Sequence, residues 1–173
     1  MPDLSALRRD LPALPLSTRS GRPIPNSPAP EPGERELALW KRECARHARW
    51  QPRRGACGVY NCWGMLWAAR RTSIWKPEVA DSILAEEYQE IDCRDLVPGD
   101  LVAYYSPAGE FIHAATVVEM RSGTGALAGL SRQPWLLSKW SAFYGESFHE
   151  LRDVVFAPVY PDFQLRFWTD RTT

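Results

Sequence analysis

The spacing of apolar and polar residues predicts a first helix over Glu34–Trp50. Leu37, Trp40 and Cys44 recur at helical spacing on one side of this segment, and charged residues occupy the other side. His47 lies among the charged residues, so we expect it on a solvated polar face. The segment should therefore pack one apolar side against the rest of a domain.

Two further helices are predicted after a loop over Gln51–Gly58. One is expected over Cys62–Arg71, where Asn61 is a good N-cap because its side chain can accept a hydrogen bond from the first turn. Pro77 can open the other helix, since the first helical position needs no N–H donor. We expect this third helix to run to about Glu90.

The second half of the chain changes to a β-strand pattern after the turn signal Pro98-Gly99-Asp100. Leu101–Tyr105 is a short apolar run, and Phe111–Glu119 is richer in β-branched residues. Because helices come first and strands follow, the order predicts an α+β fold whose N-terminal helices pack on a mostly antiparallel sheet. Further strands are expected at Ala126–Leu130, Trp135–Trp140 and Phe163–Trp168.

The first 32 residues differ in composition from the rest of the chain. They contain eight of its 15 prolines, which excludes a helix and favours extended segments. We therefore expect residues 1–32 to form a Pro-rich extended tail, either disordered or lying on the surface, and residues 33–173 to form one domain. A recognition or export role is the alternative for the tail.

Charge and hydropathy limit the possible partners. The 21 basic and 21 acidic residues cancel, so the net charge gives no support for a nucleic-acid partner or an acidic membrane surface. No run of about 18 apolar residues predicts a membrane span, and no secretory signal is recognised. The expected location is the cytoplasm, with export by a specialised secretion system as the alternative. The four cysteines are expected to be mostly reduced, and no metal or cofactor is expected.

Cys62 and His113 carry the candidate chemistry. Cys62 is predicted in the first turn of a helix behind a glycine-bearing loop, where free amides and the helix dipole favour a thiolate, the reactive form of cysteine. His113 lies on a predicted apolar strand, and a helix packed over that strand would bring the thiol within reach of the imidazole. The alternatives are a buried structural cysteine and a histidine of the core or rim.

Three motifs in this order resemble the NlpC-type branch of papain-like cysteine peptidases. They are Asn-Cys-Trp-Gly at 61–64, Leu-Val-Pro-Gly-Asp-Leu-Val at 96–102 and Ile-His-Ala-Ala at 112–115. The resemblance covers roughly residues 60–118. It implies a papain-like fold in which Cys62 is the nucleophile and His113 is its base.

The family also implies a third polar residue that orients the histidine, normally on the strand that follows it. The run Ala126–Leu130 departs from this pattern because it offers no His, Asn or Gln. His149 is chemically the best orienter among the later residues. Tyr60 lies two residues before Cys62, so its hydroxyl could face a developing oxyanion, with a packed aromatic ring as the alternative. The candidate substrate and oxyanion contacts are Tyr60, Trp63, Ser138 and Lys139.

The resemblance favours an amide hydrolase that forms an acyl-enzyme on Cys62. Its implied substrates are cell-wall peptides of the peptidoglycan kind or a γ-glutamyl amide. Such an activity suits an intracellular peptidase or deamidase, or an exported effector with an immunity or delivery partner. Two alternatives stay open at this point. One is a non-enzymatic binding module on the same fold, which the eight tryptophans favour, and the other is an acyltransferase with the same Cys-His pair.

Overall fold

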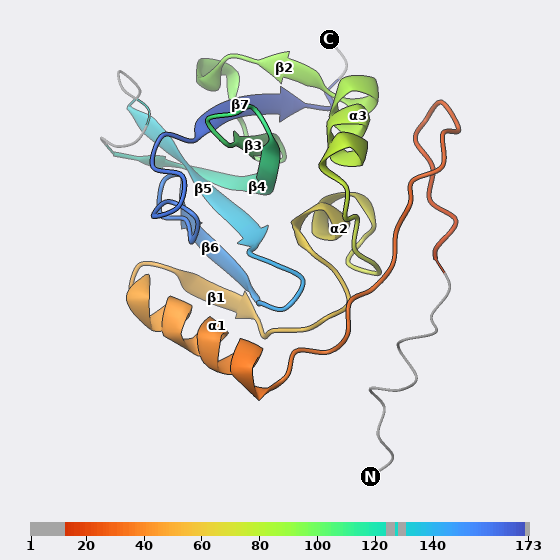
Figure 1. The fold of residues 1–173 in the computed structure, drawn as a ribbon. Helices are drawn as coiled ribbons and strands as arrows, with labels where there is room; N and C mark the ends of the chain where they lie inside the picture. Colours follow the sequence, from red (N-terminus) through yellow and green to blue (C-terminus); the bar gives the residue numbers. More distant parts are fainter. Residues whose placement is uncertain (1–12, 124–126, 128–130, 172–173) are drawn as a thin grey trace.

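The computed structural model of the chain describes residues 13–123, 127 and 131–171. This part is an α+β fold with an open seven-stranded sheet, in the order β1-β6-β5-β4-β3-β7-β2, whose neighbouring strands are all antiparallel (Figure 1). The coarse prediction of helices on an antiparallel sheet is confirmed. The elements are α1 (Glu34–Arg46), β1 (Gln51–Arg54), α2 (Cys62–Trp67), α3 (Pro77–Glu87), β2 (Gln89–Ile91), β3 (Leu101–Tyr105), β4 (Phe111–Ser122), β5 (Arg132–Lys139), β6 (Glu146–Glu150) and β7 (Gln164–Thr169).

The two faces of the sheet belong to two different apolar clusters. Since side chains alternate along a strand, Leu101 and Ala103 of β3 face one way and Val102 and Tyr104 face the other. The first pair packs with α2 and α3, which Figure 1 shows on one side of the sheet. The second pair packs with Trp40 of α1 and with the chain after β6. The face on which a β4 residue lies therefore decides which helices it can meet.

The start of β4 is irregular, and this irregularity shapes the candidate site. Tyr104 pairs with His113, but Tyr105 pairs with Phe111, so Ile112 forms a bulge and Phe111 returns to the face of α2 and α3. Pairing of β4 with β5 begins only at Thr116, opposite Leu137. The first residues of β4 are therefore not paired with β5.

Part of the N-terminal segment packs on the body of the domain. Ile24 and Ala29 are buried, and Ser27 forms a β-bridge with Ser73. Close approach is possible because Gly58 lacks a side chain, since a Cβ there would lie 1.8 Å from the carbonyl oxygen of Pro30. Residues 16–24 turn back on themselves through a Ser17–Pro23 β-bridge, and the described residues of the Pro-rich segment lie along the surface near α2 and α3 (Figure 1).

Several predicted boundaries were wrong. The first helix ends at Arg46 rather than Trp50, and part of the expected loop Gln51–Gly58 is strand β1, because it pairs with β6. The second helix ends at Trp67 rather than Arg71, since Ala69 and Arg70 adopt positive φ angles.

The end of the third helix and the third strand were also misplaced. The helix ends at Glu87 rather than Glu90, because residues 89–91 pair with β7 as strand β2. Of the expected strand Ala126–Leu130, only Leu127 is among the described residues, and it lies outside the strands. The strand beside β4 is β5, and β6 was not predicted.

Candidate active site

The start of helix α2 fixes the position of Cys62. As predicted, Asn61 caps the helix, with its side-chain oxygen accepting a 2.9 Å hydrogen bond from the Gly64 amide. Gly64 lies so close to the returning chain that a Cβ would be 1.9 Å from the carbonyl oxygen of Thr72. The contact with this loop therefore requires glycine at position 64.

The Cys62 thiol is buried, with 7% of the residue exposed. Burial raises the pKa of this thiol to about 11, because desolvation penalises the thiolate. The backbone amides of Ala114 and Trp63 and the charge of Lys139 oppose this rise, since each favours the anion. The balance leaves Cys62 as a neutral thiol at pH 7. The thiolate expected from the helix position is therefore not the stable form in this arrangement.

His113 is more deeply buried, with 2% exposed. Its ring stacks on Trp140 at 4.9 Å between centroids and lies 5.6 Å from both Tyr104 and Phe156. Burial, with a smaller effect of His149, lowers the pKa of His113 to about 3. Its Nε2 atom has no hydrogen-bond partner among the described residues. His113 therefore places a neutral imidazole, with one nitrogen that forms no hydrogen bond among the described residues, near the start of β4.

Cys62 and His113 are close along β4 but belong to different faces of it. The sulfur interacts with the amide of Ala114, the residue that follows His113. The imidazole packs with Tyr104 and Trp140 on the other face. Within the described ranges, no hydrogen bond joins the thiol to the imidazole. The structure brings the two groups to one end of β4, and their cooperation stays a prediction.

A cleft of about 720 Å³ opens at this end of β4. Its lining includes Trp63, which follows Cys62, together with His113 and Trp140. These three residues share a property: each has a buried ring nitrogen without a hydrogen-bond partner in the described part of the chain. Buried polar atoms are nearly always hydrogen-bonded in folded proteins, so three unpartnered ring nitrogens in the lining of one cleft make it a candidate ligand site, although such atoms also occur elsewhere, as at Thr72 and Trp168.

His149 does not contact His113 through a hydrogen bond in this arrangement. Its Nε2 pairs with Ser138 Oγ at 2.9 Å, and its Nδ1 pairs with the carbonyl oxygen of Glu150 at 2.8 Å. Burial lowers the pKa of His149 to about 4, so it is neutral at pH 7. The Trp140 ring lies against both imidazoles, 4.4 Å from His149 and 4.9 Å from His113 between centroids. His113 is therefore held by stacking rather than by a polar orienter.

The other two candidates are engaged in structural contacts. Tyr60 donates a 2.7 Å hydrogen bond to Glu146, which is fully buried and also accepts from Arg53 and Arg70, each at 2.6 Å. Lys139, also fully buried, donates to the carbonyl oxygens of Cys57 and Tyr144. Burial lowers the pKa of Lys139. Neither the Tyr60 hydroxyl nor the Lys139 ammonium faces a free position for an oxyanion, although the lysine charge reaches Cys62.

The acidic lining of the cleft and the stacking role of Trp140 were not predicted from the sequence. Glu78 and Asp81 come from α3, and Glu110 comes from the turn before β4. A helical pattern could have placed the first two on one face, three residues apart. Nothing in the sequence indicates that this face meets Glu110, because their proximity depends on how α3 crosses the sheet.

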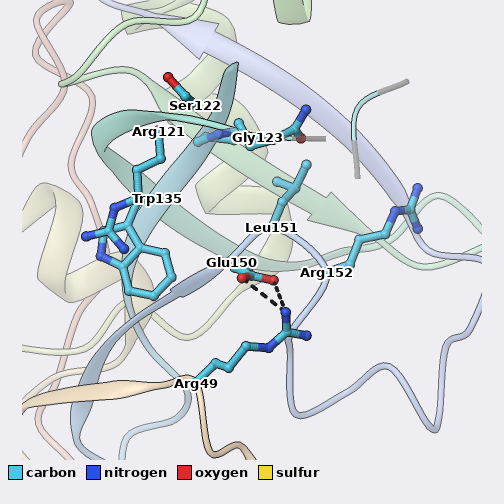
Figure 2. A pocket seen from close by; sticks show the side chains of 10 residues that line it. Arg49, Arg121, Ser122, Gly123, Trp135, Glu150, Leu151 and Arg152 are labelled. Carbon is cyan, nitrogen blue, oxygen red and sulfur yellow. Dashed lines mark hydrogen bonds and ion pairs between the residues drawn. The ribbon is translucent and has the colours of Figure 1, made fainter. Parts of the chain in front are cut away.

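A second cleft, of about 420 Å³, lies near the far end of β4 (Figure 2). Arg49, Arg121 and Arg152 line it, together with Trp135 and Glu150. Arg49 forms an ion pair with Glu150 at 3.0 Å, and the Arg121 guanidinium lies 3.9 Å from the centroid of the Trp135 ring. Its lining contains no cysteine or histidine, whereas His113 lines the first cleft and Cys62 directly precedes the lining residue Trp63.

The fold and the site together define an α+β protein with an open antiparallel sheet and a cleft that is lined by an imidazole and lies next to a buried thiol. Comparisons with protein-family models, curated proteins and solved structures found no match. All four cysteines are free thiols. The described residues contain no group of three or more His, Cys, Asp or Glu side chains placed to hold a metal ion. None of the helices in the described ranges has the length and apolar character needed to cross a membrane.

Proposed function

We propose that this protein is a cysteine-dependent amide hydrolase whose substrate occupies the cleft lined by Trp63 and His113. One arrangement carries the proposal: Cys62 packs in the same apolar cluster as Ala114, the residue after a buried histidine whose Nε2 has no hydrogen-bond partner among the described residues. A nucleophile and a base at one end of a strand, next to a cleft, are the parts that thiol catalysis needs. The resemblance of residues 60–118 to NlpC-type peptidases supports the same assignment.

The reaction has two steps. The Cys62 proton moves to His113, and the sulfur attacks the amide carbonyl carbon to form a thioester, while the leaving amine takes the proton from the imidazolium. A water molecule then attacks the thioester carbon and gives up a proton to His113, which returns it to the leaving sulfur. The products are a carboxylic acid and an amine, and the neutral thiol and imidazole are restored. Acyl transfer shares the thioester and differs only in the acceptor.

The described arrangement corresponds to a resting state in this scheme. A raised pKa at Cys62 and a lowered pKa at His113 both oppose the thiolate–imidazolium pair. For proton transfer, the imidazole must turn from its stack on Trp140 toward the sulfur. Substrate in the cleft would displace water and strengthen the attraction between the two charged groups once they are in contact.

A second candidate is a binding module without catalysis. The observation that favours it is the same pair of pKa shifts, because a neutral thiol and a neutral imidazole suit a structural role. Under this alternative, the cleft binds the same ligand but no thioester forms.

The test is cleavage of peptide mixtures and muropeptides, followed by mass spectrometry. The wild type should release products with a new carboxyl group, and Cys62→Ala should release none while remaining folded by circular dichroism. His113→Ala should lower the rate about 10²–10⁴-fold, the usual scale for loss of a general base. Cys93→Ala removes a thiol outside the cleft and should retain full activity. An active, folded Cys62→Ala variant would refute the hydrolase, and binding without cleavage by the wild type would favour the binding module.

A further inference from the structure

We infer that the cleft beside Cys62 and His113 recognises a cationic group, an ammonium or guanidinium, on an amide-containing ligand. The inference rests on the proposed function in one respect only, namely that the amide of the ligand is the group that Cys62 attacks. The recognition of charge depends on the lining itself.

The charged side chains of the lining are all acidic. Glu78, Asp81 and Glu110 contribute three carboxylates, and neither lysine nor arginine is among the lining residues. None of the three carboxylates forms an ion pair with another described residue, and Asp81 accepts only a 3.0 Å hydrogen bond from the Tyr105 hydroxyl. His113 lies on the same cleft and is neutral, so it adds no positive charge. The lining itself therefore offers a cation only attractive charges, while Arg166 lies outside the lining, 4.7 Å from the centroid of the Tyr105 ring.

The rest of the lining is largely aromatic, which suits the same ligand. Aromatic faces attract cations through their quadrupole, most strongly where water is excluded. Apolar walls also lower the local dielectric constant and so strengthen the attraction of the carboxylates. The aromatic lining residues are Trp63, Phe111, Trp140, Phe156 and Tyr160.

An independent observation points to a ligand with hydrogen-bond acceptors. The indole nitrogens of Trp63 and Trp140 are buried and without partners among the described residues. An indole N–H is a donor only, so its missing partner is an acceptor such as an amide carbonyl oxygen. The Nε2 atom of His113 is a third unpartnered position on the same cleft. The ligand is thus an amide with a cationic side group, such as a basic residue of a peptide.

The charged residues of the second cleft are mostly basic, so a cation should prefer the first cleft to the second. Three arginines and one glutamate line it, so an anionic ligand would be drawn there (Figure 2). The chain as a whole is neutral, with 21 basic and 21 acidic residues. The difference between the two clefts therefore arises from where the charges are placed.

The test is a binding measurement on Cys62→Ala, which cannot consume the ligand. Three probes are titrated by calorimetry at low salt: acetyl-lysine amide, acetyl-norleucine amide and acetyl-glutamate amide. The lysine amide should bind at least about tenfold more tightly than the norleucine amide, which has the same four-carbon chain without the ammonium group, and the glutamate amide should bind most weakly. Glu110 is exposed, so Glu110→Gln should preserve the fold. It should weaken the binding of the lysine amide severalfold. Glu119→Gln, on β4 beyond the cleft, is the matched control and should leave binding unchanged.

Equal affinity for the lysine and norleucine amides, or no binding of either, would overturn the inference. An unchanged affinity in both Glu110→Gln and Asp81→Asn would do the same. Charge-selective binding together with a wild type that cleaves no peptide would retain the cation site and reject the hydrolase. Cleavage by the wild type with no preference for basic residues would retain the hydrolase and reject the cation site.

Discussion

The sulfur of Cys62 lies at the backbone amide of Ala114, whereas the imidazole of the preceding residue occupies the opposite face of strand β4. This relationship follows from the alternation of side chains along a strand, because neighbouring residues point to opposite faces. It places the Cys62 thiol and the His113 imidazole at neighbouring positions along β4, on opposite faces, without joining them. Chemistry at this site therefore depends on whether the imidazole can turn around the end of the strand, where β5 has already left β4.

The first prediction concerns the reactivity of Cys62 in the absence of ligand. Because burial raises the pKa of this thiol to about 11, its alkylation by iodoacetamide should be slow at pH 7. The rate should rise as the pH approaches 11 in the folded protein. Labelling mapped by mass spectrometry across pH, with N-acetylcysteine as the reference thiol, gives the profile. Half-maximal labelling of Cys62 below pH 8 would mean that a charged partner activates the thiol in the resting state.

The second prediction concerns stability in mild acid. Burial lowers the pKa of His113 to about 3 and that of His149 to about 4, from 6.5 in each case. Between these values and 6.5, the unfolded chain binds protons that the folded protein does not, so stability falls as the pH falls through this window. Each histidine should contribute a slope of up to about 1.4 kcal/mol per pH unit.

Urea unfolding of the wild type and of His113→Phe between pH 4 and 7 measures this effect. The variant keeps an aromatic ring next to Trp140 but loses the titration, so its stability should depend less on pH than that of the wild type. Parallel pH profiles for the two proteins would show that His113 titrates normally in the folded state.

The third prediction concerns the buried carboxylate of Glu146. Replacing Glu146 with Gln removes the charge that holds Arg53, Arg70 and the Tyr60 hydroxyl together. Both guanidiniums are partly exposed and can regain water, so we expect a loss of about 2–4 kcal/mol, near the lower end for a broken buried pair. The matched control is Glu150→Gln, whose pair with Arg49 is exposed and should contribute less than about 1 kcal/mol. Chemical denaturation measures the free energy of unfolding of both variants. Similar losses of stability in the two variants would contradict a special contribution from the buried carboxylate of Glu146.

The parts of the fold that the sequence predicted are those that depend on local patterns. The cap at Asn61, the helix start at Pro77 and the strands at Leu101–Tyr105 and around His113 each reflect a few neighbouring residues. The edge strands β1 and β2 were missed because they exist through pairing with β6 and β7, which lie far along the chain.

The same distinction applies to the candidate site. Local pattern identified Cys62 and His113, but it could not give their relative orientation, which depends on the bulge at Ile112 and on the face that α2 covers. Tyr60 and Lys139 were expected to face substrate because of their position in the sequence. They instead satisfy buried groups on β6 and the loops beside it, contacts that only the tertiary structure brings together.

The last prediction concerns Gly64, in the first turn of the helix that carries Cys62. A Cβ at this position would lie 1.9 Å from the carbonyl oxygen of Thr72, and a backbone atom of this kind cannot move without displacing the loop. Gly64→Ala should therefore destabilise the fold by more than about 4 kcal/mol, or prevent folding, although alanine is the better helix former. Gly55→Ala is the matched control, since a Cβ there has open space around it and should change stability by less than about 0.5 kcal/mol. Thermal unfolding of the two variants compares them, and a Gly64→Ala protein as stable as the wild type would mean that Cys62 is not held as tightly as this contact requires.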